Sequence, residues 1–264
     1  MSTVVRTVLR HELRSLRHNR GVMVAAIGMM ALTELVLRLT GSAPRALITM
    51  LNIVLLIVPL VSLLVGVISW HGAREFNELL LTQPVPRRSL FQALYLALIA
   101  PLAAAFSVGV LVPLLVHRAL TPEVMPLLVA VLIGGVALTF VFGGLALLIG
   151  VQIDDRLRGV TVALAVWLVL TVAYDGVVLL IATTFSDYPL ERPMLLLTVF
   201  NPVDLARTMI IMQSDTAALM GYTGAVMNRF LGSTLGTMAT VTGLALWIFI
   251  PAFRGRRAFM RRDF

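Results

Sequence analysis

The sequence predicts an all-α integral membrane protein, with six transmembrane helices and an N-terminal amphipathic helix at the membrane interface. Two observations predict this class. Hydrophobic residues make up 59% of the 264-residue chain and charged residues only 13%, whereas a soluble domain has about 45–50% apolar and about 25% charged residues. The apolar residues also form continuous runs rather than an alternating pattern, and in lipid such runs favour helices over the strands of a barrel.

Six apolar runs are long enough to cross the hydrocarbon layer, which requires about 20 consecutive apolar residues in a helix. The first run is not expected to be a cleaved signal peptide, because it begins after twenty residues and has no A-x-A-like cleavage site. The six runs together define one transmembrane domain, residues 21–253. They cover residues 21–39, 47–70, 93–116, 127–150, 160–184 and 233–253.

Arginine provides all 21 Lys/Arg side chains, so the orientation depends on arginine alone. With a cytoplasmic N-terminus, fifteen arginines fall on inside segments and five on outside segments, and Arg38 lies near the end of the first span. This distribution follows the positive-inside rule and predicts that both termini are cytoplasmic. We therefore expect a multi-pass protein of the bacterial inner membrane. Topology and anionic lipid explain the net charge of +8, so no nucleic-acid partner is expected.

The composition also excludes several kinds of site. Without lysine the chain cannot supply a standard Walker A phosphate loop, and without cysteine it has neither a disulfide nor a thiolate metal site. The histidines show no H-E-x-x-H spacing, and no G-x-S-x-G elbow occurs. We expect no catalytic residue and no cofactor in this chain.

The two ends of the chain are basic. Residues 1–20 predict a two-faced helix, because apolar residues recur at three- and four-residue steps while arginines occupy the other side. Such a helix lies in the membrane interface with its arginines toward lipid phosphates. It is either an ordinary juxtamembrane anchor or an elbow helix that leads into the first span. Residues 254–264 are expected to form a basic cytoplasmic tail.

The cytoplasmic segment 71–92, between the second and third runs, contains the stretch REFNELLLTQPVPRRSL. Phe76, Leu79 and Leu80 share one helix face, while glutamates make the other face polar, and two prolines then end the helix. A short helix with an exposed apolar edge suits the groove of another protein. A solvated loop whose apolar edge touches lipid would have the same pattern.

The loop pattern R-E-x-x-x-E-L-L-L-T-Q-P-V-x-R-R resembles the first cytoplasmic loop of ABC-2-type permeases. The resemblance implies an ABC-2 (type V exporter-like) fold, a homodimer, and a coupling helix that docks on a separate ATPase, which would bind the ATP and magnesium. The chain itself would be a non-catalytic membrane subunit. The candidate ATPase-coupling residues are Arg74, Glu75, Phe76, Glu78, Leu79, Leu80, Gln83, Pro84, Asp154 and Asp155.

Two further stretches, VWLVLTVAYDGVVLL (166–180) and LLLTVFNPVDLARTM (195–209), carry a narrower resemblance. They are similar to the permease subunits of the copper-processing transporters that mature nitrous oxide reductase. This resemblance implies copper as a possible cargo and a periplasmic accessory protein as a partner. The chain departs from those permeases in its first external loop and in the region of the second helix.

The segment 185–232 is expected to lie on the periplasmic side and to be helical, since connections beyond about 12–15 residues usually carry structure or function. Asn201 suits an N-cap, Pro202 the first helical position, and Asp204 the positive end of the helix dipole. These residues predict a helix over 201–213, followed by a second short piece around 216–229. Together with Arg207 they are candidate contacts for the periplasmic partner, although capping alone would explain Asn201, Pro202 and Asp204.

Polar residues within the spans are costly in lipid and face a cavity or a partner. Glu34 and Arg38 stand four apart and can pair on one helix face. Asp175, beside Tyr174 in the fifth span, suits either a functional cavity or an interhelical hydrogen bond.

Methionine is the only soft ligand in the chain, and thioethers suit Cu(I). Methionine also fills irregular apolar gaps, so packing is an equally ordinary role for it. The candidate copper contacts in the periplasmic segment are Met209, Met212, Met220 and Met227. Two other functions fit the sequence: an ABC-2 exporter of lipid, polysaccharide or drug, and a passive membrane scaffold or channel without an ATPase.

Overall fold

The computed structural model describes residues 20–73, 86–185, 191–213 and 234–261. Every regular element in these ranges is a helix and none is a strand, which confirms the all-α prediction. Six of the helical segments are long and apolar enough to cross a membrane. The described part of the chain therefore has the predicted number of spans.

The first four spans are single helices: α2 (Arg20–Thr40), α3 (Ala43–Gly72), α5 (Arg87–Val116) and α6 (Met125–Gln152). The fifth span has three parts, namely α7 (Arg156–Leu168), a π-helical turn η1 (Val169–Ala173) and α8 (Tyr174–Thr184). The sixth span lies in α13 (Thr234–Arg261), so the described part of the predicted basic tail continues this helix.

Between the fifth and sixth spans, the described residues form two short helices. One is α10 (Pro202–Ile211), which matches the predicted helix start at Asn201. The other is α9 (Glu191–Phe200), which lies in the segment 185–232 that was expected to be helical but was not predicted as a separate helix. The two follow each other with only Asn201 between them, and we refer to them together as the α9–α10 hairpin.

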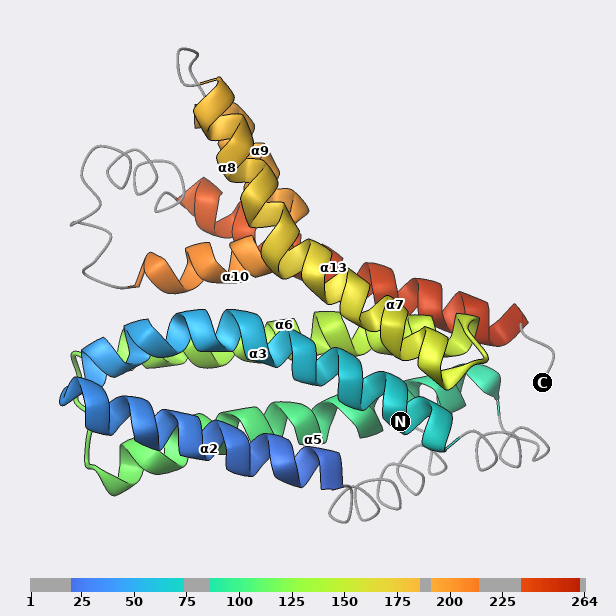
Figure 1. The fold of residues 1–264 in the computed structure, drawn as a ribbon, viewed down its shortest axis with the longest axis horizontal. Helices are drawn as coiled ribbons and strands as arrows, with labels where there is room; N and C mark the ends of the chain where they lie inside the picture. The colour runs from blue at the N-terminus through green and yellow to red at the C-terminus, as the bar shows by residue number, and fades with distance from the viewer. Residues whose placement is uncertain (1–19, 74–85, 186–190, 214–233, 262–264) are drawn as a thin grey trace.

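The helices α2, α3, α5 and α6 pack together as a bundle (Figure 1). Helix α13 packs mostly on α6, and α7 packs on α3 and α6, whereas α8 and α9 project away from the bundle. Arginines gather at the end where α2 and α5 begin and α13 ends. We call this the arginine-rich end, and the other the opposite end.

Small residues allow the spans to approach closely, as expected in lipid, where apolar burial alone does not drive helices together. Gly66 of α3 faces Ala146 of α6 so closely that a Cβ at Gly66 would lie 2.5 Å from the Ala146 Cβ. A Cβ at Gly109 of α5 would lie 2.7 Å from the Cβ of Met29 in α2. These two contacts fix how near the helix axes can be.

Gly66→Ala is therefore expected to destabilise the permease by about 1–3 kcal/mol, the usual cost of overpacking. The neighbouring atom is a Cβ of Ala146, which cannot move unless the helix itself moves. Thermal unfolding of the detergent-purified chain measures the effect as a lower midpoint.

The matched control is Gly28→Ala, in the middle of α2, where an added Cβ would meet no atom within 4 Å. This variant should unfold like the native chain. Equal midpoints for the two variants would contradict the close contact between α3 and α6.

Candidate functional site

Helix α10 packs among the spans rather than beyond them. Its Ile210 lies against Gly134, well inside α6, where an added Cβ would be 3.1 Å from the Ile210 Cδ1. Its Leu205 lies against Gly243 of α13, with a corresponding distance of 2.9 Å to Leu205 Cδ1. The segment predicted as periplasmic therefore includes a helix at the depth of the spans.

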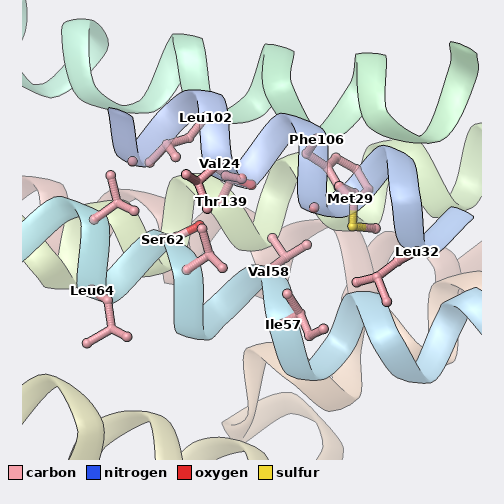
Figure 2. A pocket seen from close by; sticks show the side chains of 15 residues that line it. Val24, Met29, Leu32, Ile57, Val58, Ser62, Leu64, Leu102, Phe106 and Thr139 are labelled. Carbon is pink, nitrogen blue, oxygen red and sulfur yellow. The ribbon is translucent and has the colours of Figure 1, made fainter. Parts of the chain in front are cut away.

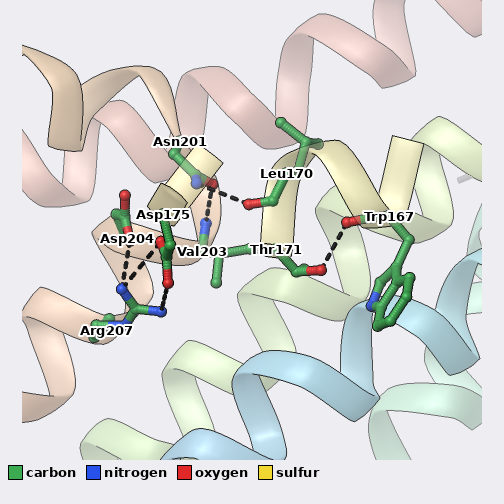
Figure 3. A network of polar contacts seen from close by, with 8 residues as sticks. All are labelled: Trp167, Leu170, Thr171, Asp175, Asn201, Val203, Asp204 and Arg207. Atoms are coloured by element: carbon green, nitrogen blue, oxygen red, sulfur yellow. Dashed lines mark hydrogen bonds and ion pairs between the residues drawn. The ribbon is translucent and has the colours of Figure 1, made fainter. Parts of the chain in front are cut away.

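Asn201 joins the start of α10 to the π-helical turn of the fifth span (Figure 3). Its Oδ1 accepts a hydrogen bond from the Val203 amide at 2.9 Å, which confirms the predicted N-cap. Its Nδ2 donates to the Leu170 carbonyl at 2.8 Å. The side chain is fully buried, so one residue satisfies backbone groups of two helices that lie apart in the sequence.

The C-terminal carbonyls of α9 are also satisfied from neighbouring elements, since the last carbonyls of a helix have no partner within it. The Tyr174 hydroxyl donates to the Leu197 carbonyl at 2.6 Å. The Trp247 indole N–H donates to the Val199 carbonyl at 3.3 Å. Side chains of the fifth and sixth spans therefore hold the end of α9.

An ion cluster completes the contact between the fifth span and α10 (Figure 3). The Arg207 guanidinium pairs with Asp175 at 2.8 Å and with Asp204 at 2.9 Å. Asp175 therefore pairs with a residue of another helix. This agrees with the interhelical hydrogen bond, one of the two roles predicted for it.

A second polar cluster lies at the opposite end. The Arg38 Nε donates to Glu34 at 2.7 Å, which confirms their predicted pairing within α2. His117, at the end of α5, also contacts Glu34 through Nε2 at 2.9 Å. The sequence did not predict this contact, because the two residues lie in different spans.

At the arginine-rich end, His71 links the end of α3 to the turn between α6 and α7. Its Nε2 lies 3.0 Å from the Ile153 carbonyl and its Nδ1 lies 2.8 Å from the Val67 carbonyl. Asp155 caps α7 by accepting from the Arg158 amide at 2.7 Å. The end of α3 therefore contacts the connection between α6 and α7, where Asp154 is exposed beside the capping residue.

An apolar groove of about 360 Å³ separates parts of α2 and α3 (Figure 2). Val24 and Met29 line it from α2, Val58 lines it from α3, and Leu102 and Phe106 lie across it on α5. None of the described residues that line the groove is charged. Its chemistry suits an acyl chain or another apolar molecule.

Several predicted site residues lie outside the described residues. They are the coupling residues Arg74 to Pro84, and Met220 and Met227. Of the other methionines, Met209 packs toward α6, with its Cε 3.4 Å from the Cβ position of Gly134. Within the described ranges, no group of three or more His, Asp or Glu side chains could hold a metal ion.

A sequence model described as "ABC-2 family transporter protein" matches residues 77–264. The match covers most of the chain, so the protein belongs to this family of multi-pass membrane permeases. A search of curated proteins found no match. The family identifies the chain as a permease subunit of an ABC transporter. Its members are generally non-catalytic transmembrane subunits, and membership implies a lipid environment and an ATP-binding cassette ATPase as partner.

Asn201→Ala should lower the stability of the purified chain by about 2–4 kcal/mol, since it removes an N-cap worth about 1 kcal/mol and leaves a carbonyl without its donor, at about 1–3 kcal/mol. Asn201→Ser retains a capping oxygen but loses the bond to Leu170. It should therefore fall between the native chain and the alanine variant in thermal unfolding.

Thr183→Ala is the control, because the Thr183 hydroxyl is exposed and bonds only within its own helix. It should leave the unfolding midpoint close to that of the native chain. If Asn201→Ala were as stable as this control, the bond from Asn201 to the fifth span would contribute nothing to the stability of the chain.

Proposed function

We propose that this permease works as a homodimer with two copies of a separate ATPase, and that it passes ATPase closure to the α9–α10 hairpin. One observation carries the proposal. The fifth span begins at the Asp155 cap beside His71, and further along it holds the hairpin through Leu170, Tyr174 and Asp175. A single span therefore connects the end where ATPase docking is expected to the hairpin.

The proposed motion is a displacement of packed helices between two arrangements. An ATPase that moves the connection after α3 would also move the turn at Ile153, because His71 joins them. The fifth span would carry this displacement to the hairpin. No catalytic group is required in the permease.

The exposure of the fifth span supports the homodimer. Among the described residues, only 6% of the apolar stretch of the fifth span is buried within the chain, compared with 28% of the corresponding stretch in α2 and in the sixth span. A second copy could cover such a face, and two-fold symmetry is the commonest arrangement of identical subunits. Two copies would also present two docking segments to two ATPases.

Docking is tested by Leu79→Asp, which places a carboxylate on the proposed apolar edge of the coupling segment. A charge in an apolar groove is costly unless it is paired, so the ATPase should no longer copurify with the permease in detergent. Thr121→Asp, on an exposed connection at the opposite end, is the control. Copurification of both variants at the native ratio would remove the coupling assignment, whereas a native chain that recovers no ATPase would favour a scaffold without one.

We place the arginine-rich end in the cytoplasm of a bacterial inner membrane, on the strength of the arginine distribution. A reporter fused after Phe264 should then behave as cytoplasmic, and one inserted near Ser214 as periplasmic. Activities of alkaline phosphatase and green fluorescent protein fusions measure the two sides. The same side for both positions would contradict the proposed topology.

The specific process we propose is copper-site maturation of nitrous oxide reductase, together with a periplasmic accessory protein. The similarity of residues 166–180 and 195–209 to permeases of that process supports it. These stretches include Tyr174, Asp175, Asn201 and Arg207, which make the contacts between the fifth span and the hairpin. Of the candidate partner contacts, Asp204 and Arg207 remain part of this proposal, whereas Asn201 and Pro202 are buried within the chain.

A direct copper role is tested by changing Met209, Met212, Met220 and Met227 together to leucine, which keeps volume and apolarity but removes the thioethers. We expect normal assembly and ATP hydrolysis, with reduced copper in the target enzyme. Metal analysis of the purified reductase measures the loss.

The control changes four exposed methionines of the spans to leucine: Met23, Met30, Met125 and Met238. It should leave copper incorporation unchanged. Full incorporation in the first variant would assign its methionines to packing alone.

The apolar groove between α2 and α3 favours a second candidate function, the export of a lipid or another apolar molecule. Transport of fluorescent lipid in proteoliposomes that contain the permease and its ATPase separates the two functions. ATP-dependent lipid movement would support the exporter, and its absence together with normal copper maturation would support the first proposal.

A further inference from the structure

A second cavity, of about 920 Å³, lies between α5 and α13 at the arginine-rich end. Its walls are mainly apolar, and they include Leu96 of α5 and Phe249, Ile250 and Phe253 of α13. Arg254, Arg256 and Gln92 provide its polar groups. The cavity therefore combines an apolar channel with two cationic side chains.

Rigid packing forms the floor of this cavity. The rings of Phe91 and Tyr95 stack with centroids 6.3 Å apart, and the Tyr95 hydroxyl donates to the Phe140 carbonyl at 3.2 Å. Near the arginine-rich end, Gly255 allows α13 to approach α5, because an added Cβ would lie 3.1 Å from Phe91 Cζ. These contacts hold α5 and α13 in place beside the cavity.

Among the described residues, the charge of the cavity is not balanced within its walls, since none of those that line it is a carboxylate. The Arg256 guanidinium lies over the Phe253 ring, 5.2 Å from the centroid, and its Nε is enclosed without a hydrogen-bond partner among the described residues. An enclosed donor without an acceptor is costly, so the site lacks an acceptor that this N–H could bond.

We propose that this cavity binds an anionic phospholipid, with the phosphate at Arg254 and Arg256 and an acyl chain along Phe249 and Ile250. Guanidinium groups match phosphate oxygens in charge and geometry. Basic pockets between transmembrane helices are suited to lipid headgroups. Arg254 and Arg256 directly follow the apolar run 233–253 of the sixth span, where basic side chains can reach lipid phosphates.

A lipid explains the cavity better than a free phosphate ion does. Free phosphate would satisfy the arginines but would leave the apolar channel empty. Phe249 and Ile250 are 69% and 50% exposed, and an acyl chain would cover both. The bound lipid would join the third and sixth spans, and this role does not depend on the proposed copper process.

The test uses the full chain purified in detergent and titrated with phosphatidylglycerol or phosphatidylcholine, with bound lipid counted by native mass spectrometry. We expect one tightly held phosphatidylglycerol per chain and weaker binding of phosphatidylcholine. Arg256→Gln should weaken phosphatidylglycerol binding about tenfold, the usual effect of one hydrogen bond to a charged group. Arg257→Gln, an exposed neighbour outside the cavity, should change it less than about twofold.

Gln92→Glu keeps the side-chain shape and places a carboxylate in the cavity, so it tests the site even if Arg256→Gln fails to fold. This variant should also lower phosphatidylglycerol binding. Equal effects of the Arg256 and Arg257 variants, equal binding of the two lipids, or unchanged binding in Gln92→Glu would each overturn the proposal. Displacement of the lipid by millimolar inorganic phosphate would likewise overturn it, because phosphate alone would then be the ligand.

Discussion

Backbone groups at membrane depth cannot bond to water, and this constraint decides how the chain between the fifth and sixth spans is built. Where α9 ends and α10 begins, carbonyls and amides of two helix termini lack helical partners. Asn201, Tyr174 and Trp247 satisfy them, and Asn201 also bonds to the Leu170 carbonyl. The hairpin can lie among the spans because these side chains take the place of water.

The same bonds make the fifth span a mechanical link. Other helices of the chain enclose little of it, so a few polar contacts fix its position. Besides the contacts to the hairpin, the Trp167 indole N–H donates to the Leu56 carbonyl at 3.0 Å. The π-helical turn Val169–Ala173 follows this anchor and includes Leu170, whose carbonyl accepts the bond from Asn201. A π-turn interrupts the regular helical bonding and often marks a functional position, so this segment is where the span would bend.

The sequence predicted features that depend on neighbouring residues. Apolar runs predicted six spans, and Asn-Pro-x-Asp predicted the start of α10, because capping is a local interaction. Contacts between distant residues could not be predicted, among them His117 with Glu34 and His71 with Ile153. Those contacts depend on which helices are neighbours and how they are rotated, and the apolar runs do not specify this. Helix α9 was also missed, since its caps come from Tyr174 and Trp247 rather than from its own sequence.

The cluster at Arg207 shows how the hairpin could separate from the fifth span without leaving a bare cation in the membrane. Removing the only partner of a buried charge is strongly destabilising, yet Arg207 has two carboxylate partners. Asp204 is on the same helix and would remain paired if Asp175 moved away. Asp175 is the more exposed of the two carboxylates, with 39% of its side chain accessible against 13% for Asp204, so the described chain encloses it less. The cluster therefore stabilises the contact with the fifth span but lowers the free-energy cost of breaking it. A contact that forms and breaks during transport requires both properties.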